Sequence, residues 1–382
     1  MSRLNELIRE LCPDGVEFKK LGVICEIKTG KGITKADAIN GGHFPIISGG
    51  KYPMGYYNEW NRQANTVTIS RVGAYAGFVS YIQEKFYLND KCFSVIPLRQ
   101  NIAPHFLFFV LKEFEEKIKV LQSEGGVPTI NTKKVGNIEI PIPPLDVQNE
   151  IVRILDTFTS HTAELQAELQ AELQARKEQY EYYRNKLLTF DKDDKNVKWM
   201  KLGEICNVQR GVRLTTKDLT SNGKYPVYHG GIDPIGYYTE YNRTANSAMI
   251  INVGASAGTV GFCQTKFWSS DGCFCFTHNN VINQKYLFYV LQSMEFIIKS
   301  KVRKAGIPTL DSKDVERINI PIIPMFEQKR IISILDKFEA LVNDLTEGIP
   351  AEIAAVQEQY EYYRNKLLTF KDVGTYHGAS ST

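Results

Sequence analysis

The sequence lacks the long apolar runs that would place it in a membrane. No stretch of ~18 consecutive apolar residues is present, which excludes a membrane-spanning helix by length. The first twelve residues mix acidic with apolar side chains and do not have the pattern of a signal peptide. We therefore expect a cytoplasmic protein that is not bound to a membrane.

Cysteine is too sparse and too irregularly spaced for a disulfide framework or a common zinc motif. The chain has seven cysteines, an odd number, and no Cys-x-x-Cys. Cys273 and Cys275 alternate along a predicted strand, so both side chains point to one face. A metal-binding pair there is one interpretation, but buried thiols are favoured.

Motifs for catalysis are also missing. Methyl transfer would need a glycine-rich cofactor loop after a strand and an Asn/Asp-Pro-Pro-aromatic motif, whereas the string IPPL at Ile142 lacks the amide or acid. Asp14 and Glu17 resemble part of a nuclease motif. Two intervening residues are too few for a hairpin to bring these carboxylates together on Mg²⁺. We expect no catalytic residue, no metal site and no cofactor, and an enzyme is a disfavoured alternative.

Net charge is low, but its distribution is informative. The formal charge is +3 for 382 residues. Residues 1–145 and 191–325 are net positive, whereas residues 146–190 and 326–382 are net negative. Alternation of this kind predicts that the positive segments contact phosphate and the negative segments do not.

The chain is a tandem duplication. The segment EQYEYYRNKLLTF at residues 178–190 recurs letter for letter at 358–370. Other strings recur at nearly the same offset: KLGVICEI and KLGEICNV, VGAYAG and VGASAG, GVPT and GIPT, and IPIPPLDVQNEIVRILD and IPIIPMFEQKRIISILD. A period of about 180 residues is too long for a solenoid repeat and indicates a duplicated domain plus helix.

The sequence pattern of each repeat predicts an α/β module followed by a long helix. The modules, about 20–140 and 201–320, have short β-rich runs separated by glycine, asparagine and proline turns, one helical stretch and a proline-rich end. The expected division is residues 1–145 for a first globular domain, 146–190 for a central spacer helix, 191–325 for a second globular domain, and 326–382 for a C-terminal spacer helix and tail.

Apolar residues in the two helices follow steps of four and three, which is a coiled-coil seam. The seam is polar only at Thr162 and Arg176 and comprises Ile151, Leu155, Phe158, Thr162, Leu165, Leu169, Leu173, Arg176, Tyr180, Tyr183 and Leu187, and Ile331, Leu335, Phe338, Val342, Leu345, Ile349, Ile353, Val356, Tyr360, Tyr363 and Leu367. We expect the helices to bury it by packing antiparallel against each other, with a pseudo-two-fold relation between the modules. Gly348 and Pro350 should interrupt the second helix.

This order of motifs resembles the specificity subunit of type I restriction–modification systems over nearly the whole chain. The strings that carry the resemblance are LCPDGVEFKKLG, GGKYPMGYY with GGIDPIGYY, the GVPT and GIPT turns, the two proline-rich helix starts and the KLLTF helix ends. The resemblance implies two target-recognition domains that each read half of a bipartite site in double-stranded DNA. It also implies that the helices bind two adenine methyltransferase subunits. A restriction–translocase subunit then joins to complete the restriction complex. A coiled-coil adaptor that binds only proteins is the alternative.

The first helix contains a four-residue repeat, TAELQAELQAELQA, at residues 162–175. Short repeats at this place are a feature of the family, although the second helix has none. A plain helix of good helix formers is the simple interpretation. The other is a ruler, because one AELQ adds ~6 Å of helix, on the order of two base-pair rises. We hypothesise that the repeat number sets the gap between half-sites.

Matched polar and basic loops in both repeats predict the DNA contacts. Glycine allows close approach to the backbone, Lys and Arg neutralise phosphates, and Arg or Asn can read guanine or adenine. The candidate DNA-binding residues are Lys28, Lys31, Thr34, Lys35, Ser70, Arg71 and Asn89 in the first module, and Arg210, Arg213, Thr216, Lys217, Asn252 and Ser270 in the second.

The identical segment at the two helix ends predicts one protein-binding surface present twice. Its tyrosines at 180, 183, 360 and 363 lie on the seam, whereas other positions face away from it. The candidate partner-binding residues are Tyr182, Arg184, Asn185, Tyr362, Arg364 and Asn365. The apolar stripe of residues 4, 7, 8 and 11 is expected to pack near the end of the second helix and bring the termini together.

Overall fold

The structure is a computed structural model that describes residues 3–123, 126–191, 194–343 and 348–373. The chain divides into two compact units. Unit 1 combines residues 1–167 with 354–382, and unit 2 comprises residues 168–353. Each unit therefore joins one module to segments of both long helices. In the part of the chain that the structure describes, no helix is long and apolar enough to cross a membrane.

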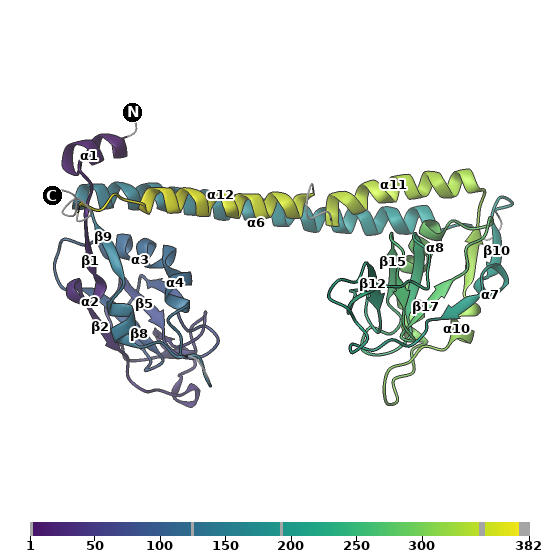
Figure 1. Cartoon of the computed structure of the whole chain (residues 1–382), viewed down its shortest axis with the longest axis horizontal. Coiled ribbons are helices and arrows are strands. Elements are labelled where there is room, and N and C mark those ends of the chain that lie inside the picture. The colour runs from purple at the N-terminus through teal and green to yellow at the C-terminus, as the bar shows by residue number, and fades with distance from the viewer. Residues whose placement is uncertain (1–2, 124–125, 192–193, 344–347, 374–382) are drawn as a thin grey trace, which may run out of the picture. The chain divides into compact units, whose positions relative to one another are not determined.

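Unit 1 contains a mixed module of helices and strands (Figure 1). In chain order its elements are α1 (Arg3–Leu11), β1 (Glu17–Lys20), α2 (Leu21–Ile24), β2 (Cys25–Thr29), the 3₁₀ turn η1 (Lys35–Asp37), β3 (Phe44–Ile47), β4 (Tyr56–Tyr57), β5 (Thr66–Ser70), β6 (Val79–Ile82), β7 (Tyr87–Leu88), β8 (Cys92–Pro97), α3 (Pro104–Glu113), α4 (Glu115–Lys119), α5 (Thr132–Gly136) and β9 (Glu139–Ile142). The long helix α6 (Leu145–Leu188) comes next.

The core of this module is a four-stranded antiparallel sheet in the order β2-β8-β5-β6. The side chains of Val67, Phe93 and Val95 enter the main core, which α3 covers with Phe106 and Val110. Residues that alternate with them point to the opposite face, where β4-β3-β7 forms a second, smaller sheet. Because both faces are covered, every residue of β5 is buried.

Unit 2 repeats this arrangement. Its elements are β10 (Lys198–Lys201), α7 (Leu202–Ile205), β11 (Val208–Arg210), β12 (Tyr225–Tyr228), β13 (Gly236–Tyr238), β14 (Ser247–Ile251), β15 (Val260–Cys263), β16 (Trp268–Ser269), β17 (Cys273–Phe276), α8 (Gln284–Ser293), α9 (Glu295–Ser300), α10 (Ser312–Glu316) and β18 (Asn319–Ile322). The sheet orders β11-β17-β14-β15 and β13-β12-β16 match those of unit 1, which confirms the duplication.

Recurring polar residues explain part of the sequence repeat. The Asn61 side chain donates to the Leu88 carbonyl and accepts the Leu88 N–H, so it replaces a strand partner. Asn242 makes the same pair of bonds to Ser269. Asn65 and Asn246 both have a φ of 57°, a left-handed conformation that asparagine tolerates better than most residues. The shared NR-x-x-N string is therefore structural.

A buried glutamine fastens each long helix to its module. Gln148 of α6 is fully buried; its side chain accepts the Ala103 N–H and donates to the carbonyls of Asn101 and Pro143. In unit 2 Gln328 accepts the Asn283 N–H and donates to two carbonyls in the same way. The segment before α3 or α8 is thereby fixed to the start of the helix.

The helices pack antiparallel in each unit, as predicted. In unit 1 the Phe158 ring lies 5.9 Å from Tyr363, and the Gln166 amide donates to Gln357, so numbers rise along α6 as they fall along α12 (Ile349–Leu368). In unit 2 Tyr183 stacks on Phe338 of α11 (Met325–Asn343) at 5.6 Å.

The prediction of a buried seam was only partly right. Ile151 and Leu155 are fully buried beside the module of unit 1, but Phe158 and Leu165 are 38% and 43% exposed. In a pair of helices, the partner helix covers each seam position from one side only. Full burial therefore needs a third helix or a module on the other side. The middle of α6 therefore retains an apolar surface.

The second helix is interrupted at Gly348, as expected. Helix α11 ends at Asn343, Gly348 is not helical, and α12 begins at Ile349. The Gly348 carbonyl accepts the first bonds of α12, and Pro350 lies in the first turn, where its missing N–H costs nothing. The predicted seam residue Leu345 lies outside the described residues.

The two ends of the described chain meet in unit 1. Val16 forms a bridge with Asp372: its N–H donates to the Lys371 carbonyl at 2.8 Å, and its own carbonyl accepts from Val373. Gly15 has a φ of 120°, and a Cβ there would collide with Lys371. Leu4 of α1 (Figure 1) is buried in the same core as Leu368, and Leu7 and Ile8 pack against that core, which confirms the expected packing for these three residues of the N-terminal stripe; the fourth, Leu11, is 43% exposed.

Candidate nucleic-acid interface

The loop after β2 is held against the turn that joins β7 to β8. The Lys31 N–H donates to the Leu88 carbonyl at 2.9 Å, and the Asn89 side chain donates to the Ile33 carbonyl at 2.7 Å. A Cβ at Gly30 would collide with the Leu88 and Asn89 carbonyls, so only glycine allows this approach. The basic loop of residues 28–35 is therefore a fixed part of the module edge.

Two further segments join the same edge. The Arg71 N–H donates to Lys91 in the β7–β8 turn, and the Arg71 carbonyl accepts from Ile130. The Gly73 N–H donates to Pro128 of the GVPT string. The loop after β2, the end of β5, the β7–β8 turn and the GVPT loop thus form one continuous surface, which we call loop edge 1 (residues 28–35, 70–73, 89–91 and 126–130).

Basic side chains on loop edge 1 differ in how freely they face solvent. Lys28, Lys31, Lys35 and Lys91 are exposed, although Lys28 lies 3.6 Å from Glu26. Arg71 is half-buried: its guanidinium stands over the Phe93 ring at 5.6 Å and donates to the Asp90 carbonyl. Four exposed ammonium groups can approach phosphates from this edge.

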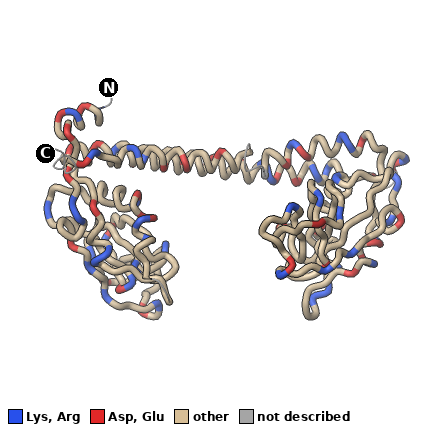
Figure 2. The backbone as a smooth tube through the Cα atoms, in the orientation of Figure 1, with Lys and Arg blue, Asp and Glu red and all other residues tan. Residues whose placement is uncertain are grey.

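Unit 2 builds the corresponding loop edge 2 from residues 210–217, 252–254, 270–272 and 303–310. The Asn252 N–H donates to Gly272, its carbonyl accepts from Leu310, and the Gly254 N–H donates to Pro308. Arg210, Arg213 and Lys217 are exposed, and the Arg210 Nε donates to the Asp271 carbonyl. The backbone groups of Arg303 and Thr309 bond to each other in a hairpin, and the segment at its start carries Lys299, Lys301 and Lys304 (Figure 2 draws all Lys and Arg residues in blue).

Four of the candidate DNA-binding residues need correction, because their side chains are buried. Ser70 is 4% exposed and lies beside Cys92, and Asn89 is 1% exposed, donates to the Ile33 carbonyl and accepts the Lys91 N–H. Ser270 is fully buried and bonds both backbone groups of Leu214, and Asn252 is 3% exposed. The matched side chains of Asn89 and Ser270 therefore hold loops in place, whereas the Asn252 Oδ1 is buried without a hydrogen-bond partner among the described residues.

The threonine candidates also have a structural explanation. The Thr34 hydroxyl and its backbone N–H both donate to the carboxylate of Asp37, the last residue of η1, and these bonds lower the pKa of that carboxyl. In unit 2 the same arrangement joins Asp218 to Thr215. Thr215, and not the candidate Thr216, is therefore the counterpart of Thr34. Thr216 itself is exposed.

The candidate partner-binding segment differs between the units. Tyr182 and Tyr362 are 59% and 61% exposed, as expected for residues off the seam. Arg364 and Asn365 both donate to the carboxylate of Glu113, at 2.7 and 2.8 Å. These two residues are therefore occupied within unit 1, which corrects their assignment to a free surface. In unit 2, Arg184 is half-buried and Asn185 is exposed.

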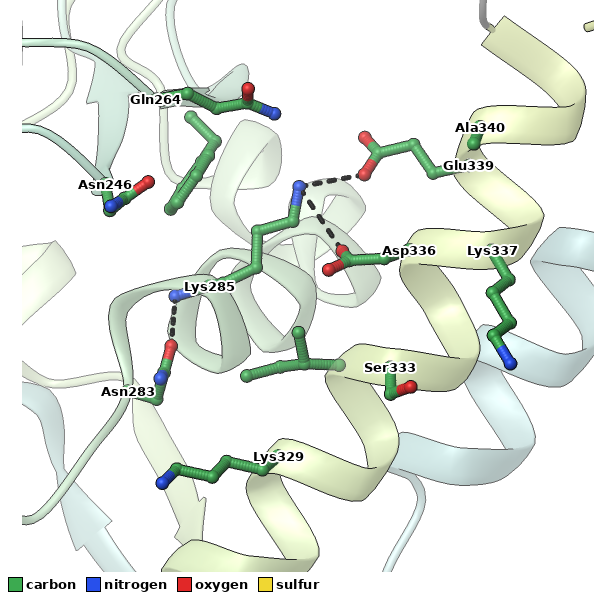
Figure 3. A pocket seen from close by; sticks show the side chains of 12 residues that line it. Asn246, Gln264, Asn283, Lys285, Lys329, Ser333, Asp336, Lys337, Glu339 and Ala340 are labelled. Atoms are coloured by element: carbon green, nitrogen blue, oxygen red, sulfur yellow. Dashed lines mark hydrogen bonds and ion pairs between the residues drawn. The ribbon is translucent and has the colours of Figure 1, made fainter. Parts of the chain in front are cut away.

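Unit 2 contains a groove of about 900 Å³ between its module and α11 (Figure 3). The Lys285 ammonium lies 2.9 Å from Glu339 and 3.6 Å from Asp336, and it stands over the Phe262 ring. Tyr289 donates to Glu339 at 2.8 Å; burial and these carboxylates raise the pKa of its hydroxyl. This cluster fastens module to helix.

Unit 1 has a related fastening with different chemistry. His105 replaces Lys285, stacks on Tyr81 at 4.6 Å and on Phe109 at 5.0 Å, and lies 3.3 Å from Asp156. Sequence reasoning did not select these residues or the glutamines. The feature of the sequence that could have revealed them is a polar residue at equivalent positions of two otherwise apolar helical stretches.

The seven cysteines are free and buried, as favoured from the sequence. Burial raises the pKa of Cys25 and of Cys92 to about 12, so these thiols are protonated at neutral pH. Among the described residues, no three His, Cys, Asp or Glu side chains form a group that could hold a metal.

Comparison with known proteins places these two modules in one family. The family model described as the type I restriction modification DNA specificity domain matches residues 13–175 and again 194–355. The chain belongs to the type I DNA specificity family. It is 36% identical to a putative type I restriction enzyme specificity subunit of Haemophilus influenzae, over 93% of this chain and 96% of that protein.

Other relatives of the family agree. The EcoR124I/EcoR124II specificity subunit of Escherichia coli is 35% identical over 97% of this chain and 98% of its own. Among solved structures, a chain from a study of type I restriction–modification complex assembly has a TM-score of 0.69 at 17% identity, over 94% of this chain and 98% of that chain. The S subunit from M. genitalium has a TM-score of 0.52 at 20% identity, over 93% and 96% of the two chains. Both share the fold of this chain.

Proposed function

We propose that this chain is the DNA-reading specificity subunit of a type I restriction–modification complex, acting in the cytoplasm. The observation that carries the proposal is the repeated loop edge. In both modules, separate loops are fixed together by backbone hydrogen bonds and present exposed Lys or Arg side chains. A rigid basic edge suits a duplex, because ammonium and guanidinium groups neutralise phosphates while fixed loops bring side chains to base edges.

Each module reads one half of a bipartite site in double-stranded DNA. In module 1 the proposed phosphate contacts are Lys28, Lys31 and Lys35, with Arg71 beside them as a reader. In module 2 they are Arg210, Arg213, Thr216 and Lys217. The loop edges have the same framework but different exposed side chains, as two readers of different half-sites require.

The helices bind the catalytic subunits. The half-exposed Phe158 and Leu165 leave apolar surface on α6 in unit 1, and each unit also has an exposed tyrosine ring off the seam, Tyr362 in unit 1 and Tyr182 in unit 2. Surfaces of this kind suit protein partners. We assign them to adenine methyltransferase subunits, two per chain because the segment occurs twice, with restriction–translocase subunits joining the complex. The chain itself supplies recognition and assembly, and no catalysis.

A methylation map tests the proposal. The chain is co-expressed with the methyltransferase subunit encoded beside it, and methylated adenines are located across the host genome. The expected result is a two-part motif with an unread gap, present only when this chain is expressed. Methylation without the chain would instead favour the protein-binding adaptor.

A further inference from the structure

The identical helix segments differ in what faces them. Residues 178–190 and 358–370 have the same sequence, and residues 181–190 and 361–370 have the same pattern of buried and exposed positions. In unit 1 the segment packs on a module whose α3 ends at Glu113. In unit 2 it packs on a module whose α8 ends at Ser293. One carboxylate is therefore replaced by a hydroxyl at the same place in the fold.

The unit 1 contact defines what this pair of side chains binds. The Arg364 Nε donates to one oxygen of Glu113 at 2.7 Å, and the Asn365 Nδ2 donates to the other at 2.8 Å. The side chains of Arg364 and Glu113 are only 15% and 16% exposed. Two donors directed at two oxygens form a carboxylate site, and a charged, shielded pair of bonds is stronger than a neutral one.

In unit 2 the same donors lack this acceptor. The Arg184 Nε is buried and has no hydrogen-bond partner among the described residues, while its guanidinium stands over the Tyr180 ring at 5.4 Å. The Ser293 hydroxyl donates to the Val290 carbonyl of its own helix, and it accepts no hydrogen bond from the Arg184 Nε. A buried guanidinium N–H without an acceptor is costly, and an incoming acceptor would recover that cost.

We propose that Arg184 and Asn185 form a binding site for a carboxylate of a partner protein, which takes the place that Glu113 occupies in unit 1. The partner presents a Glu or Asp side chain to the exposed Asn185 beside Tyr182, which is itself 59% exposed. The two helix ends thus offer different surfaces to otherwise similar partners, one with its carboxylate supplied internally and one that must receive it. This inference rests on the proposed function, which supplies the methyltransferase subunit as the partner.

The chain offers a matched test. Ser293→Glu would supply the missing carboxylate from within, as Glu113 does, and Ser293→Gln provides similar size without charge. Asn185→Ala removes one donor at an exposed position. Affinity of the full-length chain for the methyltransferase subunit is measured by titration calorimetry, and affinity for a duplex carrying the mapped motif is measured with the chain alone.

We expect Ser293→Glu to weaken methyltransferase binding about tenfold relative to Ser293→Gln, since the internal carboxylate would displace a charge-assisted hydrogen bond to the partner, and Asn185→Ala to weaken it in the same direction. DNA affinity of the chain alone should not change. Equal binding by the Ser293→Glu, Ser293→Gln and Asn185→Ala variants would overturn the inference. Weaker DNA binding with normal methyltransferase binding would overturn it too, because the site would then serve phosphate. If the unaltered chain binds no methyltransferase subunit, the proposed function itself is wrong, and the inference with it.

Discussion

The Gln148 side chain accepts the backbone N–H of Ala103 at 2.8 Å, and through this bond the first turn of α6 is tied to the residue that precedes α3. Gln328 repeats the contact with Asn283 in unit 2. Each glutamine is completely buried and satisfies three backbone groups, so it determines where the helix leaves the module. Correct placement of two DNA readers on a helical support depends on such joints.

Gln148→Leu is expected to destabilise unit 1 by about 1–3 kcal/mol, because it leaves the Ala103 N–H and two carbonyls buried without partners. Hydrogen exchange of α3 and the start of α6, followed by mass spectrometry, would detect this loss in unit 1 alone. Gln328→Leu should produce the same effect in unit 2. Unchanged exchange in both variants would show that the glutamines do not fasten the helices.

Stability of unit 1 should depend on pH through Glu115. Burial opposes ionisation of this carboxyl, but bonds from Lys112, the Val79 N–H and Lys119 outweigh it and lower its pKa below 4.5. A lowered folded-state pKa means that the stabilisation is complete above about pH 4.5 and is lost as the pH falls through the folded value.

Glu115→Gln should therefore destabilise unit 1 by about 1 kcal/mol at pH 7, and the difference from the unaltered chain should disappear in acid. Urea unfolding between pH 3 and pH 7 measures it. Glu116→Gln is the control, because that side chain is 84% exposed and should have little effect. A Glu115→Gln difference that persisted unchanged at pH 3 would contradict the assignment.

The exposed lysines of loop edge 1 should act on DNA through phosphates. Replacing Lys31 and Lys35 by alanine is expected to weaken binding and to reduce the slope of log K against log salt by about 0.9 for each phosphate that is no longer neutralised. Fluorescence anisotropy over a salt series measures both. Lys20→Ala, an exposed lysine of β1 outside the loop edge, is the matched control. An identical slope for the double variant and the control would remove these lysines from the interface.

The four-residue repeat remains a hypothesis about spacing. The residues of the AELQ repeat are helical throughout within α6, so deletion of Ala167–Gln170 would shorten that helix by ~6 Å and rotate its C-terminal part by about 40°. The expected result is a methylated motif with both halves unchanged and a shorter gap. An unchanged gap after the deletion would reject the ruler.

The sequence was sufficient for the architecture and insufficient for the site. Thirteen identical residues at a fixed offset revealed the duplication, and the steps of four and three along Ile151, Leu155 and Phe158 revealed the helix pair. Ser70 and Asn252 were misassigned because a polar residue at a strand end has the same pattern whether it faces solvent or supports a loop. Burial decides between these roles, and burial depends on loops more than 50 residues distant in sequence, such as the GVPT string.

The contacts of Glu113 could not have been predicted for a similar reason. Glu113 and Arg364 are 251 residues apart, and they meet only because the end of α12 packs against the module at the start of the chain. The identical sequence of the two helix ends suggested identical surfaces. The difference lies in the module that faces each helix end, which has Glu113 in unit 1 and Ser293 in unit 2. A comparison of the two helix segments alone cannot reveal it.

The most direct test of the account is a module exchange. Residues 20–140 are replaced by the matching module of a family member with another specificity, and methylated adenines are mapped with the same methyltransferase subunit. The account predicts that one half of the two-part motif changes while the other half and the gap stay the same. Changes in both halves, or an undivided motif, would contradict the central claim that each module reads its own half-site.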